Sequence, residues 1–163
     1  MTIFFEKFTF MKNKSENFDF NDTIDPIEFA QDLVKIVYEH NGICLAAPQI
    51  GIPYRVFAMR GEPQNFVCFN PRIVMPSEET IVLEEKSLTW PGLLVKVRRP
   101  RHVKVRFATP NSEVRTETYT GLTARAFLQS MDFLDGYEFY RRANPIHREQ
   151  AFRKMKQWER QHK

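Results

Sequence analysis

Six β-rich segments follow one another closely in the middle of the chain, and this spacing constrains the fold more than any other feature. Each segment is rich in β-branched or aromatic residues and is separated from the next by Pro, Gly, Asn or Ser. The segments are Tyr54–Arg60, Phe66–Met75, Thr80–Glu85, Leu93–Val97, His102–Ala108 and Val114–Tyr119. Helix signals precede and follow them, so we predict an α+β fold in which short strands pack around a helix.

Three helices are expected. The first begins at Asp25-Pro26, because Asp is a favoured N-cap and Pro suits the first helical position, and it ends at Asn41-Gly42. Its predicted buried stripe has helical spacing and consists of Ile27, Ala30, Leu33, Val34, Val37 and Tyr38. The second covers about residues 122–142. The third covers about 146–162, with Phe152, Met155 and Trp158 on its apolar side.

The length of 163 residues suits one domain, 1–163. We expect residues 1–24 to form an N-terminal arm, Phe-rich over 2–10 as a strand or a contact segment and polar loop over 11–24, and residues 144–163 to form a basic C-terminal helix. Two cysteines are too few for a disulfide framework, and no apolar run approaches the ~20 residues of a membrane span. These features predict a cytoplasmic protein with no membrane partner.

Three further segments carry motif-like sequence: GICLAAPQIG at 42–51, EKSLTWPG at 85–92 and GLTARAFLQSMDFLDG at 121–136. In order and spacing they resemble the three motifs of the peptide deformylase family, G-x-G-L-A-A-P-Q, E-G-C-L-S-x-P-G and G-L-x-A-R-A-x-Q-H-E-x-D-H-L-x-G. The resemblance covers about residues 25–143 and implies a deformylase-like fold. The N-terminal stretch departs from the family.

The resemblance also implies a metal site, and there the chain departs from the family. Deformylases hold Fe²⁺ or Zn²⁺ with one Cys of the second motif and two His four residues apart on the third, beside a Glu that transfers the proton. The matching positions are Ser87, Gln129, Phe133 and, for the Glu, Ser130. A hydroxyl and an amide are weak ligands and Phe is none, so we expect no metal, no cofactor and no catalytic residue at these degenerate positions. We expect the Phe133 ring to fill the former metal cavity against Leu45, Leu88 or Ser87.

Other positions of the family's substrate groove are retained. Gln49 and the backbone N–H of Leu88 match groups that hydrogen-bond the formyl oxygen of the substrate in the family. Glu85 and Arg99 match a bracing pair, and Asp132 is expected to bond a neighbouring backbone group or Arg125. The residues expected to line a peptide-binding groove are Ile43, Gln49, Leu83, Glu85, Leu88 and Ala126.

Retained packing with deleted chemistry favours a catalytically inactive deformylase-like protein that serves as a binding or assembly module with a protein partner, for example a phage virion component. One alternative is a pseudoenzyme that binds peptide N-termini in the former groove. Another is a hydrolase with altered chemistry through Cys44, Ser87 or Ser130. A fourth is an RNA-binding module, because the net charge is +4 and basic residues gather on the last helix. Its contacts would be Arg153, Lys154, Lys156, Arg160 and Lys163.

Overall fold

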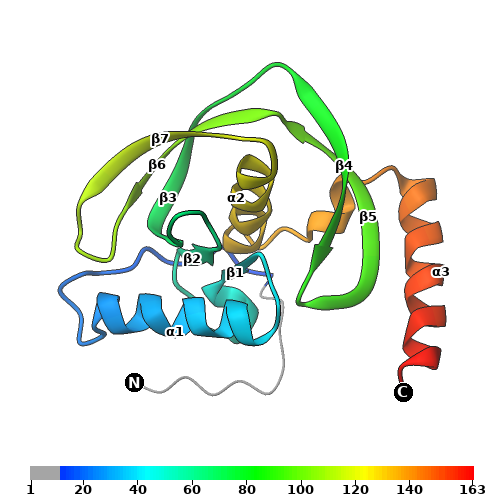
Figure 1. Cartoon of the computed structure of the whole chain (residues 1–163), viewed down its shortest axis with the longest axis horizontal. Coiled ribbons are helices and arrows are strands. Elements are labelled where there is room, and N and C mark those ends of the chain that lie inside the picture. The colour runs from blue at the N-terminus through cyan, green and yellow to red at the C-terminus, as the bar shows by residue number, and fades with distance from the viewer. Residues whose placement is uncertain (1–11) are drawn as a thin grey trace.

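The computed structural model describes residues 12–163, so the Phe-rich segment predicted at 2–10 lies outside the described residues. Within the described residues, seven strands form two antiparallel sheets (Figure 1). The larger sheet has the order β1-β2-β3-β6-β7, with β1 Cys44–Ala46, β2 Val56–Met59, β3 Phe66–Pro76, β6 His102–Ala108 and β7 Val114–Thr120. The smaller sheet is a hairpin of β4 (Thr80–Ser87) and β5 (Trp90–Pro100). All six predicted segments contain a strand, whereas the short β1 was not predicted.

Different helices cover the two faces of the larger sheet. Side chains alternate along β2, so that Phe57 and Met59 belong to one buried cluster and Val56 and Ala58 to the other. The first cluster includes residues of α2 (Gly121–Leu134), and the second includes residues of α1 (Pro26–Glu39). Figure 1 shows α2 at the centre of the molecule, between the larger sheet and the β4–β5 hairpin. The α+β prediction, with strands around a central helix, is confirmed.

Helix α1 begins where the sequence predicted. The Asp25 carboxylate accepts hydrogen bonds from the backbone N–H groups of Ile27 and Glu28 at 2.8 and 3.3 Å. The predicted buried stripe was partly wrong, because Ile27 and Tyr38 are 47% and 45% exposed whereas Phe29 and Ile36 are buried. An aromatic cluster explains the difference: the ring of Phe29 lies 6.0 Å from that of Phe18 and 6.3 Å from that of Phe69.

Phe18 also corrects the prediction of a purely polar loop over 11–24. Its side chain is only 4% exposed, and its ring centroid lies 4.9 Å from that of Phe69 in an edge-to-face contact. Its backbone N–H donates to the side-chain oxygen of Asn70 at 2.7 Å. This segment therefore contributes to the core beneath α1.

Helix α2 ends at Leu134, so the predicted extent of 122–142 was too long. Gly136 follows the helix with φ of 69°, a left-handed conformation that commonly ends helices. A Cβ atom there would also lie 2.5 Å from the backbone oxygen of Lys12, so only glycine fits. A short 3₁₀ helix, η2 (Phe139–Arg142), then leads to the last helix.

Helix α3 (Pro145–Gln161) packs on β5, on the outer side of the hairpin (Figure 1). The side chain of Asn144 caps it by accepting from the backbone N–H groups of Ile146 and His147. Trp158 lies over the backbone of Gly92. Within residues 12–163 we find no helix with the length and apolar character that crossing a membrane requires.

Candidate functional site

A pocket of about 620 Å³ opens where the end of α1, the start of β1, the β4–β5 hairpin and α2 meet. Its walls combine apolar side chains with a small number of charged and amide groups, as is typical of ligand sites. The lining residues are His40, Asn41, Gly42, Ile43, Cys44, Glu84, Glu85, Lys86, Ser87, Leu88, Leu94, Leu122, Arg125, Ala126 and Gln129. We refer to this cavity as the pocket.

The pocket gathers most of the residues that the sequence placed in a peptide groove. Ile43, Glu85, Leu88 and Ala126 line it. Gln49 and Leu83, which were assigned to the same groove, are not among its lining residues.

Gln49 is buried, at 2% exposure, and its side chain contacts the pocket-lining residue Ser87. Its side-chain oxygen accepts from the backbone N–H of Ala46 at 2.8 Å, and its nitrogen donates to the hydroxyls of Thr89 and Ser87 at 2.9 and 3.3 Å. Gln49 thus holds the β4–β5 turn in place from beneath.

Ser87 ends β4, and its hydroxyl oxygen accepts two hydrogen bonds. One comes from the Gln49 amide and the other from the backbone N–H of Thr89 at 3.2 Å. A hydroxyl has one hydrogen of its own to donate, so Ser87 can still act as a donor on the pocket wall.

Gln129 links α2 to the neighbouring strands. Its amide nitrogen donates to the backbone oxygen of Lys86 at 3.1 Å and to the Glu85 carboxylate at 3.2 Å, and its oxygen lies 3.7 Å from the Cys44 sulfur, which donates to it. Ser130, one residue further, donates its hydroxyl hydrogen to the backbone oxygen of Ala126 at 2.9 Å. Ser130 and Phe133 do not line the pocket.

Phe133 is buried, at 2% exposure, as the sequence predicted. The partners expected for its ring were Leu45, Leu88 or Ser87. Leu45 belongs to the buried cluster on the α1 side of the larger sheet, and Leu88 packs against that cluster. Phe133 belongs to the cluster on the α2 side, and its ring centroid lies 6.2 Å from that of Phe139.

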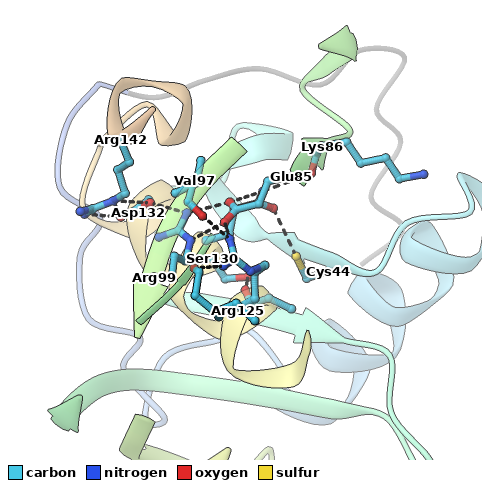
Figure 2. Close-up of polar contacts among 12 residues, drawn as sticks. Cys44, Glu85, Lys86, Val97, Arg99, Arg125, Ser130, Asp132 and Arg142 are labelled. Carbon is cyan, nitrogen blue, oxygen red and sulfur yellow. Dashed lines mark hydrogen bonds and ion pairs between the residues drawn. The ribbon is translucent and has the colours of Figure 1, made fainter. Parts of the chain in front are cut away.

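Buried charges connect α2 to the hairpin behind the pocket. Figure 2 shows Glu85 between the guanidinium groups of Arg99 and Arg125. The expected brace exists: Arg99 donates to both Glu85 oxygens, at 2.6 and 2.8 Å. Asp132 was expected to bond a neighbouring backbone group or Arg125. Its carboxylate pairs with Arg99 and Arg142 instead, and Arg125 is bound to Glu85. Burial alone would lower the pKa of Arg99, but Glu85 and Asp132 outweigh burial and raise it.

Cys44 lines the pocket in a half-buried position. Burial raises the pKa of its thiol to about 11. The thiol is therefore neutral at physiological pH and does not have the character of an activated nucleophile.

The residues present do not fit the metal ion that the family resemblance implies. Among residues 12–163 no three His, Cys, Asp or Glu side chains come together in a group that could hold an ion. Glu85 is held by two arginines, and Gln129 is satisfied by its own hydrogen bonds.

Several pocket residues were missed by sequence reasoning. His40, Leu94 and Leu122 line the pocket although none belongs to the expected groove. Leu122 stands in the third motif and could have been found by projecting α2 as a helix. His40 and Leu94 come close only through the tertiary fold, so the sequence carried no local signal for them.

Comparison with known proteins identifies the fold and the family. The family model for polypeptide deformylase matches residues 6–149. Peptide deformylases from Natranaerobius thermophilus and Phenylobacterium zucineum are 40% and 38% identical, covering 73% and 77% of this chain and 77% of each relative. The deformylase structure from Synechococcus elongatus in complex with actinonin has a TM-score of 0.82 at 26% identity, covering 88% of this chain and 80% of that one. The structure from Legionella pneumophila has the same fold, with a TM-score of 0.85 at 24% identity and 97% of both chains covered.

These relatives overturn the expected function. Named peptide deformylases at 33–40% identity over 71–79% of the chain point to a functional deformylase. The expectation of an inactive structural or assembly module or a pseudoenzyme is therefore wrong, and nothing supports the expected phage or virion origin. The match to the family model, together with relatives at 40% and 38% identity, shows that this chain belongs to the peptide deformylase family.

Proposed function

We propose that this protein is a peptide deformylase, which removes the formyl group from the N-terminal residue of peptide chains. The observation that carries the proposal is the identity of 33–40% to named peptide deformylases over most of the chain. We also propose the cytoplasm, where peptide chains are made, as its place of action.

The pocket supports the proposal through its shape and lining. It is about 620 Å³ in volume, which suits one or two residues of a peptide end. Ile43, Leu88 and Leu94 offer apolar surface for the first side chain, while Lys86 and Arg125 supply cations at the wall.

Ser87 is the donor that we assign to the formyl oxygen. Its hydroxyl accepts hydrogen bonds from Gln49 and Thr89, which leaves its hydrogen for a partner in the pocket. A hydrogen-bond donor that faces an oxygen gaining negative charge during attack stabilises the transition state. Removing such a donor lowers kcat by a factor of about 10²–10³. Gln49 acts behind Ser87 as the positioning residue.

His40 is the proton acceptor that we assign to the attacking water. Its Nδ1 lies 3.1 Å from the backbone oxygen of Ile36, which can only accept, so Nδ1 carries the hydrogen. In the neutral ring Nε2 is then the basic nitrogen. Hydrolysis of the formamide adds water at the formyl carbon, breaks its C–N bond and leaves formate and a free amine.

Formate release from a formyl-methionyl peptide tests the proposal. We expect the wild type to release formate above a no-protein blank, with the Natranaerobius thermophilus relative as positive control. Ala126→Trp, which places a bulky ring at the pocket wall, should abolish release, and the matched Ala126→Ser should retain it. Ser87→Ala and His40→Asn should each lower kcat, with Glu84→Gln as the matched pocket control. No release by folded wild type, at any pH or peptide length, would overturn the proposal.

A binding measurement separates recognition from hydrolysis. Isothermal titration with the formylated peptide and its unformylated twin should show preference for the formylated one, lost in Ala126→Trp. Binding without formate release would retain the assigned pocket and refute the assigned reaction.

A further inference from the structure

We propose that the Gln129 amide replaces a metal ion as the link between α2 and β4, so that this pocket takes up no divalent cation. The inference concerns the construction of the site and goes beyond the proposed reaction. It does not depend on the outcome of the formate assay.

The Gln129 side chain bridges α2 and the neighbouring strands. It leaves α2 and ends between β4 and β1, with its nitrogen donating to the backbone oxygen of Lys86 and to Glu85 and its oxygen facing the Cys44 sulfur. The amide thus joins three elements at one point. An amide with both ends engaged would have to break these bonds before its oxygen could face an ion.

The other three positions that correspond to the family's metal site, Ser87, Ser130 and Phe133, are also engaged within the protein. Ser87 faces the Gln49 amide, and Ser130 is bound to the helix backbone at Ala126. Phe133 is turned into the core against Phe139. No anionic or imidazole ligand is available at any of them, and ions such as Zn²⁺ need such ligands.

The charges near Gln129 also disfavour a bound cation. Behind Gln129, the guanidinium groups of Arg99, Arg125 and Arg142 surround the carboxylates of Glu85 and Asp132. Three cations against two anions leave a positive excess before any ion arrives. A dication placed against Gln129 would meet this excess and would draw Glu85 away from its arginines, leaving buried positive charge unpaired.

Metal content and metal-dependent stability test the inference without an activity readout. Protein purified without a histidine tag, from cells supplied with iron, zinc and nickel, should contain far less than one ion per chain by elemental analysis. Added Zn²⁺, Ni²⁺ or Co²⁺ should leave the melting temperature unchanged, since a ligand that binds the folded state must raise it. One tightly held ion per chain that is lost in Gln129→Met would overturn the inference.

A gain-of-metal variant provides the positive control. A variant with four changes should bind Co²⁺, with visible absorption bands and a raised melting temperature. The four changes are Ser87→Cys, Gln129→His, Ser130→Glu and Phe133→His. The double variant Ser87→Cys, Gln129→His retains the buried Phe133 and covers the case in which the fourfold variant does not fold. The double variant should show weaker Co²⁺ bands than the fourfold variant. Co²⁺ bands in the wild type as strong as those of the variants would refute the inference.

The link itself is tested by Gln129→Met, which keeps the side-chain length and removes both hydrogen-bonding groups. We expect faster amide hydrogen exchange at the end of β4 and in the middle of α2, and a lower melting temperature. Gln129→Glu is the matched polar control, and it should be more disruptive because it places a second carboxylate against Glu85. Unchanged exchange in both variants would show that Gln129 does not serve as the link.

Discussion

Arg99 holds Glu85 through two parallel hydrogen bonds, from Nε to Oε2 at 2.6 Å and from Nη2 to Oε1 at 2.8 Å, with both side chains at most 4% exposed. The geometry is the planar fork in which guanidinium and carboxylate match best. The same Arg99 also donates to Asp132 on α2 at 3.0 Å. One side chain therefore connects β5 to β4 and to the central helix.

Replacing Arg99 by alanine should destabilise the protein strongly. The change leaves the buried carboxylates of Glu85 and Asp132 short of one positive partner, and breaking a buried pair in this way costs about 3–5 kcal/mol. Urea unfolding followed by circular dichroism measures the loss. Arg101→Ala is the control, because Arg101 and Glu79 form an exposed pair that contributes about 0–1 kcal/mol. Equal midpoints for the two variants would contradict the assigned role.

Truncating Phe133 tests where its ring lies. Because the side chain is buried against Phe139 on the α2 side of the sheet, Phe133→Ala should cost about 3–5 kcal/mol. Leu122→Ala, at a position 71% exposed on the same helix, should change the unfolding free energy little. The pocket is lined by other residues, so Phe133→Ala should leave peptide binding intact at a temperature where the variant is folded.

The sequence predicted the fold well because local signals and the three motifs agree. Capping by Asp25, the six strand segments and the α+β class all appear in the structure. Errors arose where tertiary contacts decide. The rotation of α1 that buries Phe29 depends on Phe18 and Phe69, which come from distant segments. The end of α2 depends on Gly136, whose backbone meets Lys12.

The site was predicted less completely for a similar reason. Motif positions placed Ile43, Glu85, Leu88 and Ala126 around one cavity, because neighbouring elements bring the motifs together. The partner of Asp132 could not be deduced, since two arginines compete for it and Arg125 is already held by Glu85. The inference of inactivity was wrong because it rested only on the absence of the family's metal ligands. That absence concerns one mechanism, whereas the named relatives indicate the function of the family.

Cys44 should be slow to react with alkylating reagents. An acid whose pKa rises from 9.0 to about 11 has about a hundredfold smaller thiolate fraction at pH 8, and the thiolate is the reactive form. Iodoacetamide labelling mapped by mass spectrometry should show slow modification in the folded protein and rapid modification in urea. Labelling of folded Cys44 as fast as in urea would contradict a neutral thiol with a raised pKa.

From the raised pKa of the Cys44 thiol we predict the direction in which stability changes with pH. Between about pH 9 and 11 the unfolded state loses the Cys44 proton while the folded state keeps it, so the unfolded state binds fewer protons and stability falls as the pH rises. The decline in melting temperature over this range should be shallower in Cys44→Ala. A steeper decline in the variant would reverse the assigned sign.

The contact between Gly92 and Trp158 is expected to hold α3 on β5. Gly92 has φ of 79°, and a Cβ atom built there would lie 2.5 Å from a carbon of the Trp158 ring, far inside van der Waals contact. Gly92→Ala should therefore push Trp158 off β5 and loosen α3, with faster hydrogen exchange along 145–161 and earlier tryptic cleavage within that helix.

Gly121→Ala is the matched control, because Gly121 also has a positive φ, of 57°, but a Cβ atom there meets nothing within 4 Å. Both variants carry backbone strain, and only Gly92→Ala adds the clash. Loosening of α3 in Gly92→Ala alone assigns the effect to the glycine–tryptophan contact, whereas the same loosening in both would assign it to strain.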